Sequence, residues 1–176
     1  MSSKWKKRNR KAKVAATLVP AKYIAYTDGS ALNNPGPGGY GAVVRCGDTK
    51  VTLSKGYYKT TNNRMEIMAV IATLEEFGPN ETFDLYIDSE YVINGSTMWM
   101  RGWERNNWIT FKTQTPVKNK DLWMIMSDLL KQNVVRFHKV RAHSGIPDNE
   151  EADKLAKDAA RNPEVQDIEY MNLIGI

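Results

Sequence analysis

The sequence has too few cysteines and histidines for a disulfide framework or a zinc cluster. Its 176 residues include one cysteine, Cys46, and two histidines. A lone cysteine excludes an internal disulfide and offers no set of thiolate ligands for zinc, so a cytoplasmic location is expected. No apolar run approaches the roughly 20 residues that span a bilayer, so no membrane segment is expected. The length suits a single domain, and we expect a monomer.

Acidic residues are absent from the first 13 positions, which hold seven of the 25 lysines and arginines. The other residues carry 18 basic against 20 acidic side chains, so the formal charge of +5 belongs mainly to this N-terminal arm. Repelling charges with little to bury predict disorder in isolation. The arm can bind phosphate groups, with Trp5 stacking on a base, or it can serve only as a solubilising tail.

The order of strand and helix patterns predicts the fold class. β-Rich stretches predict strands over residues 22–27, 40–47, 50–61, 82–88 and 133–140. Helical patterns predict a helix from Asn62 or Asn63 to just before Gly78, short helical pieces from Ser89 to about Arg105, and helices over 120–132 and 150–161. The first three strands suit an antiparallel meander, and the fourth can return parallel to the first through a helical crossover. We therefore predict an α/β fold with a mixed sheet flanked by helices.

Two aspartates follow predicted strands. Asp28 comes at the end of the first strand, and Asp88 comes at the end of the fourth. If these strands are adjacent and parallel, both carboxylates emerge at the edge where open α/β sheets place their sites. Each also has a local explanation, since Asp28 before Gly29 can form an Asx-turn and Asp88 can cap the next helix.

Two more acids lie in predicted helices. Glu66 is the one charge within the apolar stretch MEIMAVIATL, although Asn63 and Glu66 also have the spacing of a capping box. Asp153 falls at the edge of the apolar stripe of the last helix, on the same side as Asn149, and it can equally be a solvated charge. Gathered acids would raise one another's pKa unless cations neutralise them, and oxygen ligands favour Mg²⁺ or Mn²⁺. The spacing leaves open whether the four acids converge.

Long motifs in a fixed order resemble one family. They are YTDGSALNNPGPGGYGAVV, TTNNRMEIMAV, YIDSEYVINGST, TPVKNKDLW and VRAHSGIPDNEEADKLA. Together they make residues 23–161 similar to type 1 ribonuclease H. The resemblance implies a ribonuclease H-like fold whose five-stranded mixed sheet has three antiparallel and then two parallel strands. It also implies a flexible arm over 1–21, a catalytic domain over 22–162 and a C-terminal tail over 163–176.

The activity that the resemblance implies is cleavage of the RNA strand of an RNA–DNA hybrid, leaving 3′-hydroxyl and 5′-phosphate ends. Asp28, Glu66, Asp88 and Asp153 correspond to the family's metal-binding carboxylates, with two Mg²⁺ ions expected and Mn²⁺ as a substitute. His143 matches the catalytic-loop histidine, and imidazole suits proton transfer or product release. The alternative is a catalytically silent module that only binds hybrids.

The same resemblance assigns substrate contacts. The residues expected to contact the hybrid are Asn34, Thr61, Asn62, Asn63, Glu90, Tyr91, Trp99, Asn119 and Asn149. The amides at 34, 62 and 63 match minor-groove readers, whereas Thr61 matches a DNA-phosphate contact with Arg64 and Asn119 as possible additions. Tyr91 and Trp99 match an aromatic pair that packs on DNA sugars, although core packing would also explain them.

Two features depart from the family pattern. Glu90 stands where many relatives have glutamine, so an extra carboxylate is expected to weaken hydrogen-bond donation to RNA or to alter metal preference. The loop over residues 102–116 resembles a substrate-binding protrusion but has few basic residues, with Arg101 just before it and then Arg105 and Lys112. The N-terminal arm is expected to supply the missing phosphate contacts.

Overall fold

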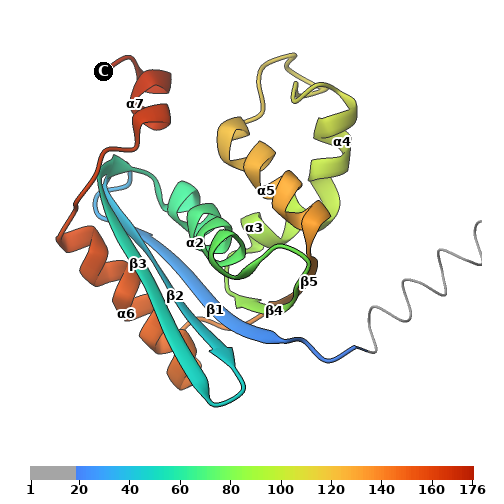
Figure 1. Ribbon diagram of the computed structural model, residues 1–176. Helices are drawn as coiled ribbons and strands as arrows, with labels where there is room; N and C mark the ends of the chain where they lie inside the picture. Colours follow the sequence, from blue (N-terminus) through green and yellow to red (C-terminus); the bar gives the residue numbers. More distant parts are fainter. Residues whose placement is uncertain (1–18) are drawn as a thin grey trace, which may run out of the picture.

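A five-stranded mixed sheet forms the centre of the molecule (Figure 1). The computed structural model describes residues 19–176, so nearly all of the predicted N-terminal arm lies outside it. The strands are β1 (Tyr23–Ala31), β2 (Gly36–Cys46), β3 (Thr49–Thr60), β4 (Thr82–Ile87) and β5 (Val134–Lys139). Their order is β3-β2-β1-β4-β5, with antiparallel β1–β2 and β2–β3 pairs and parallel β1–β4 and β4–β5 pairs. The predicted fold class and topology are confirmed.

The first hairpin is longer than predicted. We expected the first strand to end at residue 27 and a glycine-rich loop to follow. Instead β1 continues to Ala31 and pairs with β2, whose first residue is Gly36. Asp28 therefore lies inside a strand and not in a turn. This glycine-rich stretch forms strands because a residue without a side chain allows a helix to pack closely against the sheet.

The helices follow the predicted order with shifted ends. They are α2 (Asn62–Phe77), α3 (Glu90–Asn94), a π-helical turn (Gly95–Trp99), α4 (Met100–Arg105), α5 (Lys120–Gln132), α6 (Pro147–Arg161) and α7 (Ile168–Ile174). Thr61, not Asn62 or Asn63, caps α2, because its hydroxyl accepts a hydrogen bond from the Arg64 amide. Helix α6 begins three residues earlier than predicted, so Asn149 is helical. No helix within residues 19–176 is long and apolar enough to cross a membrane.

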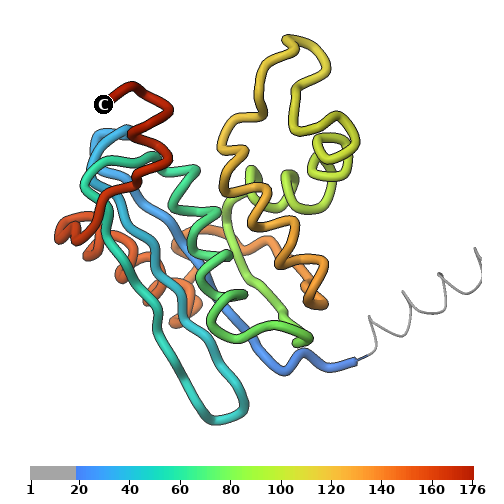
Figure 2. Tube along the Cα trace, turned by 45° about the horizontal axis from the view of Figure 1, so that its top comes forward, coloured from blue at the N-terminus to red at the C-terminus, as the bar shows by residue number. Residues whose placement is uncertain are grey.

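Two layers of helices cover the sheet. Helix α2 packs on β1 and β2 and against α5, whereas α6 lies across β1, β2 and β3 on the other face (Figures 1 and 2). Two glycines permit the close packing: a Cβ on Gly29 would overlap the backbone of Glu66, and a Cβ on Gly41 would overlap the carbonyl oxygen of Ala152. Since Gly41 is the β2 partner of Asp28, both helices approach the sheet at the same place.

The C-terminal segment is fastened to the domain by a buried arginine. Arg64 is 1% exposed, and its Nε lies 2.7 Å from Asp167 Oδ2 while its Nη2 lies 2.7 Å from Asp121 Oδ2. Asp167 also accepts a hydrogen bond from the Thr60 hydroxyl at 2.7 Å and caps α7 through the Tyr170 amide. These bonds connect α2, α5 and the last helix. The resemblance made Arg64 a possible DNA-phosphate contact, but its guanidinium is bonded to Asp121 and Asp167 inside the protein.

Arg64→Met should destabilise the fold by about 3–5 kcal/mol, because it leaves the buried Asp167 and the partly buried Asp121 without their cation. Urea unfolding monitored by circular dichroism measures this change. Lys22→Met is the control, since Lys22 forms an exposed ion pair with Glu81 and its loss should cost at most about 1 kcal/mol. Equal losses in the two variants would contradict a special role for the buried network.

Candidate functional site

The strand register brings Asp28 and Asp88 together. Tyr26 of β1 pairs in parallel with Tyr86 of β4, and each aspartate lies two residues beyond its tyrosine. Because side chains alternate along a strand, both carboxylates also lie on the same face as those tyrosines. The structure thus places the two aspartates side by side at one sheet edge.

Glu66 joins them from helix α2. One carboxylate oxygen from each of Asp28, Glu66 and Asp88 lies within 4.8 Å of the other two. Glu66 is 7% exposed. Gly29 makes this approach possible because it lets the backbone of Glu66 lie against β1. The predicted capping box with Asn63 does not form, since Thr61 is the cap, and Glu66 is directed at the aspartates.

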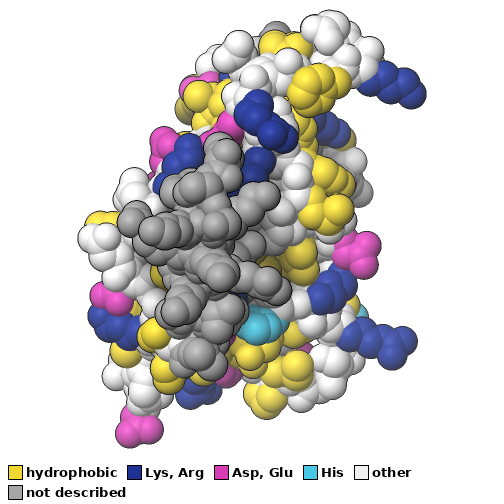
Figure 3. All heavy atoms as spheres, turned by 90° about the vertical axis from the view of Figure 1, so that its right-hand side faces the viewer, with side chains coloured by type: hydrophobic (Ala, Val, Ile, Leu, Met, Phe, Trp, Pro, Cys, Tyr) yellow, Lys and Arg dark blue, Asp and Glu magenta, His cyan; other side chains and the backbone are white. Residues whose placement is uncertain are grey.

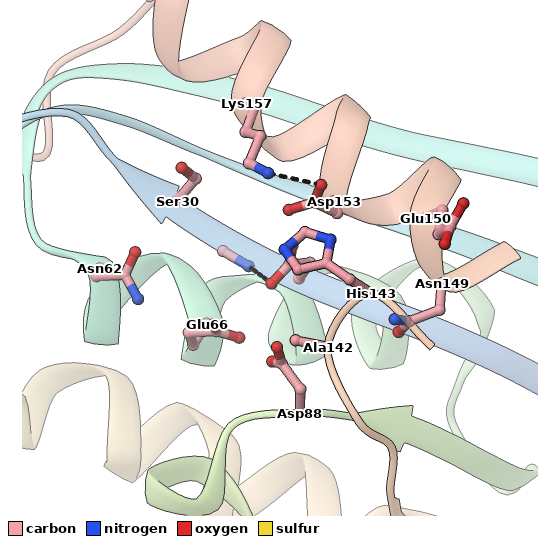
Figure 4. A pocket seen from close by; sticks show the side chains of 12 residues that line it. Ser30, Asn62, Glu66, Asp88, Ala142, His143, Asn149, Glu150, Asp153 and Lys157 are labelled. Carbon is pink, nitrogen blue, oxygen red and sulfur yellow. Dashed lines mark hydrogen bonds and ion pairs between the residues drawn. The ribbon is translucent and has the colours of Figure 1, made fainter. Parts of the chain in front are cut away.

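Asp153 lies on the other side of Asp28. It reaches the site from α6, and its carboxyl group lies close enough to help raise the pKa of Asp28. The four acids share a cavity of about 270 Å³ with His143, Asn62 and Asn149. Figure 4 shows Glu66 and Asp88 pointing toward the space between α2 and the end of β4, with Asp153 across from them on α6. The tertiary structure therefore brings together the acids that are far apart in sequence.

Burial and mutual repulsion make two carboxyl groups of this cluster, Asp28 and Glu66, weaker acids than usual. Desolvation and then the Asp88 charge raise the pKa of Asp28 from 3.8 to about 8. Burial and the charges of Asp28 and Asp88 also raise the pKa of Glu66 well above its usual value. Within residues 19–176, no lysine or arginine forms an ion pair with either side chain. A compact, buried set of carboxylate oxygens without a cation fits a hard divalent metal ion.

One basic side chain reaches the cavity. Lys157 lies one turn after Asp153 on α6, and its Nζ is 2.7 Å from Asp153 Oδ2 (Figure 4). The lysine therefore neutralises one of the four carboxylates that line the cavity. Sequence reasoning missed it, although the i,i+4 spacing of Asp153 and Lys157 was a usable signal.

His143 lines the cavity from the loop before α6. Its φ angle is +53°, and the residues around it from 141 to 145 are exposed. The imidazole has room to turn toward a ligand in the cavity (Figure 4). Among the other predicted residues, Asn149 is buried in α6 and lines the same cavity.

Three predicted amide residues stand around the start of α2. The side-chain oxygen of Asn34 accepts a hydrogen bond from the backbone N–H of Asn62 at 3.0 Å. The side-chain oxygen of Asn62 accepts one from the backbone N–H of Ala31 at 3.2 Å. Because both carbonyl oxygens are used within the protein, the side-chain NH₂ groups are the parts available to a ligand. Asn63 is half-buried in the first turn of α2.

The predicted aromatic pair belongs to a larger cluster. The Tyr91 and Trp99 rings are 6.2 Å apart, and Trp123 packs against Tyr91 at 5.5 Å. The Tyr91 hydroxyl accepts hydrogen bonds from Asn119 Nδ2 at 3.0 Å and Trp123 Nε1 at 3.2 Å. Tyr91 is half-buried and Trp99 is exposed, so the cluster is anchored in the core and reaches the surface.

The metal-free protein should lose stability as the pH rises from about 4 to about 8. In that range the folded protein keeps the proton on Asp28 that the unfolded chain has released, so rising pH favours unfolding. Glu66 contributes in the same direction. In EDTA, Asp28→Asn should flatten this slope and raise stability at pH 8 by about 2–4 kcal/mol. Urea titrations at several pH values test this, with Asp48→Asn in the exposed β2–β3 turn as the control. If the free energy of unfolding of Asp28→Asn fell with pH as steeply as that of the wild type, this explanation would be wrong.

Lys157→Met should tighten Mn²⁺ binding about two- to fivefold, because a metal ion would no longer compete with the ammonium for Asp153. Isothermal titration without nucleic acid measures the affinity directly. Lys154→Met is a matched control on the same helix, since Lys154 pairs with Asp158 at the same i,i+4 distance but is 77% exposed. Unchanged or weaker binding in Lys157→Met would show that the lysine does not compete.

Comparisons with known proteins agree with this geometry. The sequence model of the RNase H family matches residues 20–161. Ribonuclease HI of Haemophilus influenzae is 43% identical over 153 residues, which cover 87% of this chain and 99% of that protein. The crystal structure of LC9-RNase H1, a type 1 RNase H with the type 2 active-site motif, matches with a TM-score of 0.73 at 27% identity, over 83% of this chain and 75% of that chain. LC11-RNase H1, solved in complex with an RNA/DNA hybrid, matches with a TM-score of 0.57 at 25% identity, over 80% of this chain and 98% of that chain. The chain therefore belongs to the ribonuclease H family, as a type 1 member.

Proposed function

We propose that this protein hydrolyses internal phosphodiester bonds in the RNA strand of RNA–DNA hybrids and leaves 3′-hydroxyl and 5′-phosphate ends. The observation that carries the proposal is the convergence of Asp28, Glu66 and Asp88, with Asp153 beside them, in one cavity at the sheet edge. Membership of the ribonuclease H family supports it. A structural neighbour bound to such a hybrid supports the choice of substrate.

The four carboxylates would hold two Mg²⁺ ions, with Mn²⁺ as a substitute. Such a pair lowers the pKa of water and stabilises charge on the attacking and leaving oxygens. Asp28 is central because one of its carboxylate oxygens lies within 4.8 Å of one from each of Glu66 and Asp88, and Asp153 lines the same cavity. The protein's part is to hold these oxygens in a fixed arrangement that excludes much of the solvent around Glu66. His143, at the open side of the cavity, would move a proton or assist product release.

Hybrid recognition would use the groups around the start of α2 and the aromatic cluster. The free NH₂ groups of Asn34 and Asn62 suit acceptors in the minor groove, with Asn63 and Asn149 nearby. Thr61 and Asn119 would contact the DNA strand's phosphates, and Tyr91 with Trp99 would pack on its sugars. An additional 2′-hydroxyl would obstruct that sugar packing, which gives a physical reason for requiring DNA on this side.

The protrusion between α4 and α5 would contribute apolar more than ionic contact. Hydrophobic side chains gather at this end of the molecule in Figure 3, and Phe111 is 66% exposed. The segment between these helices holds two lysines, Lys112 and Lys118, and α4 before it adds Arg101 and Arg105. Phosphate attraction would then depend on other segments, among which the basic N-terminal arm lies outside the described residues. The single cysteine suits a cytoplasmic location, which belongs to this proposal. We also propose that the protein acts as a monomer.

Cleavage of a labelled RNA–DNA hybrid in Mg²⁺ tests the proposal. The wild-type protein should cut only the RNA strand, and EDTA should stop it. Asp28→Asn should lower kcat at least about a hundredfold, because it removes a ligand shared by the cluster. Asp48→Asn, in the exposed turn between β2 and β3, should leave kcat unchanged. Hybrid binding without cleavage in both Mg²⁺ and Mn²⁺ would instead favour a catalytically silent binding module.

A further inference from the structure

Lys139 holds the turn that carries Asp88. It is the last residue of β5 and pairs in parallel register with Ile87, the last residue of β4. Its Nζ donates a hydrogen bond to the backbone carbonyl oxygen of Asp88. The neighbouring Ile87 carbonyl accepts the Val140 amide at 2.9 Å, so the Asp88 carbonyl is the first one beyond the ladder between these strands. The lysine therefore adds a side-chain hydrogen bond just past the end of the pairing between these strands.

The same ammonium faces Glu90. Lys139 Nζ lies 3.6 Å from Glu90 Oε1, and the two side chains are 47% and 77% exposed. Glu90 begins α3 two residues after Asp88, and Ser89 caps this helix by accepting the Val92 amide hydrogen. Glu90 thus adds a fifth carboxyl group near the four that line the cavity. A polyanionic strand approaching this edge would be repelled unless a cation offsets that charge.

We propose that Lys139 is a positioning residue with two linked tasks: it fixes the peptide that follows Asp88, and it neutralises Glu90 so that the RNA strand can approach the site. This inference rests on the proposed function. The first task acts on the geometry of the Asp88 carboxylate, and the second acts on the field along the substrate path. Glu90 is tolerated at this position because its counter-ion comes from β5.

A double-mutant cycle with Lys139→Met and Glu90→Gln separates the two tasks. Methionine keeps much of the length of the lysine stem without the charge, and glutamine keeps the shape of Glu90. Lys139→Met should weaken binding of an uncut hybrid in EDTA about two- to fivefold, because Glu90 becomes unpaired. Adding Glu90→Gln should restore that affinity. Lys139→Arg, which keeps the charge, should also preserve it.

The positioning task has its own measurement. Lys139→Met should weaken Mn²⁺ binding in the absence of hybrid and lower kcat in Mg²⁺, and Glu90→Gln should not restore kcat, because the bond to the Asp88 carbonyl stays broken. Melting temperatures confirm that the variants are folded. The pair Lys22–Glu81, which joins β1 to the start of β4 at the opposite end of these strands, is the matched control. Lys22→Met and Glu81→Gln should change neither binding nor kcat.

Three outcomes would overturn the inference. One is additive effects of Lys139→Met and Glu90→Gln on hybrid affinity, and another is an equal loss of affinity in Lys22→Met, which would reflect net charge alone. The third is unchanged Mn²⁺ affinity and kcat in Lys139→Met. A wild-type protein that binds hybrids without cutting them would refute the proposed function, while the binding and Mn²⁺ measurements would still decide the role of Lys139. A wild-type protein that does not bind hybrids would refute both.

Discussion

The repulsion between carboxylates buried around Asp28 is the constraint on which the site depends. Glu66 is removed from water beside two other acids, and no lysine or arginine within residues 19–176 pairs with it or with Asp28. Without a cation, the cluster relieves its charge by holding protons, which is the physical meaning of the raised pKa values. The site is thus destabilising by itself, and a divalent ion that binds the folded state would reverse that cost.

The ion pairs of Arg64 hold in place the helix that carries Glu66. Two residues before Glu66 on the same helix, Arg64 is a buried cation whose guanidinium is fully engaged by Asp121 and Asp167. One turn of α2 therefore carries a buried cation with its counter-ions toward the C-terminal segment, and toward the sheet edge it carries the carboxyl group of Glu66, which has no cation partner within residues 19–176. The first fixes the helix in place, and this fixed position is what holds Glu66 against its neighbours.

Lysines at the rim moderate the field of the cluster. Lys157 pairs with Asp153, and Lys139 faces Glu90 while bonding the backbone after Asp88. Both side chains are partly exposed, so they offset charge without occupying the buried centre. This distribution leaves the centre for a metal ion and makes the entrance less repulsive to a nucleic-acid backbone.

The sequence by itself determined the order of strands and helices, the family motifs and the identity of the acids, because these depend on local pattern. It also placed Asp28 and Asp88 at one edge, since adjacent parallel strands leave little choice. It did not reveal that β1 runs through Asp28, because the glycines that it carries look like a loop until a helix is seen packed against them. Only the tertiary structure decided that Asp153 shares a cavity with Asp28, that Arg64 faces inward and that the C-terminal helix is tied to α2. It also decided that Lys139 bonds the Asp88 carbonyl. Each of these depends on how closely separate elements pack, and a local sequence pattern does not predict the distance between elements that are far apart in the chain.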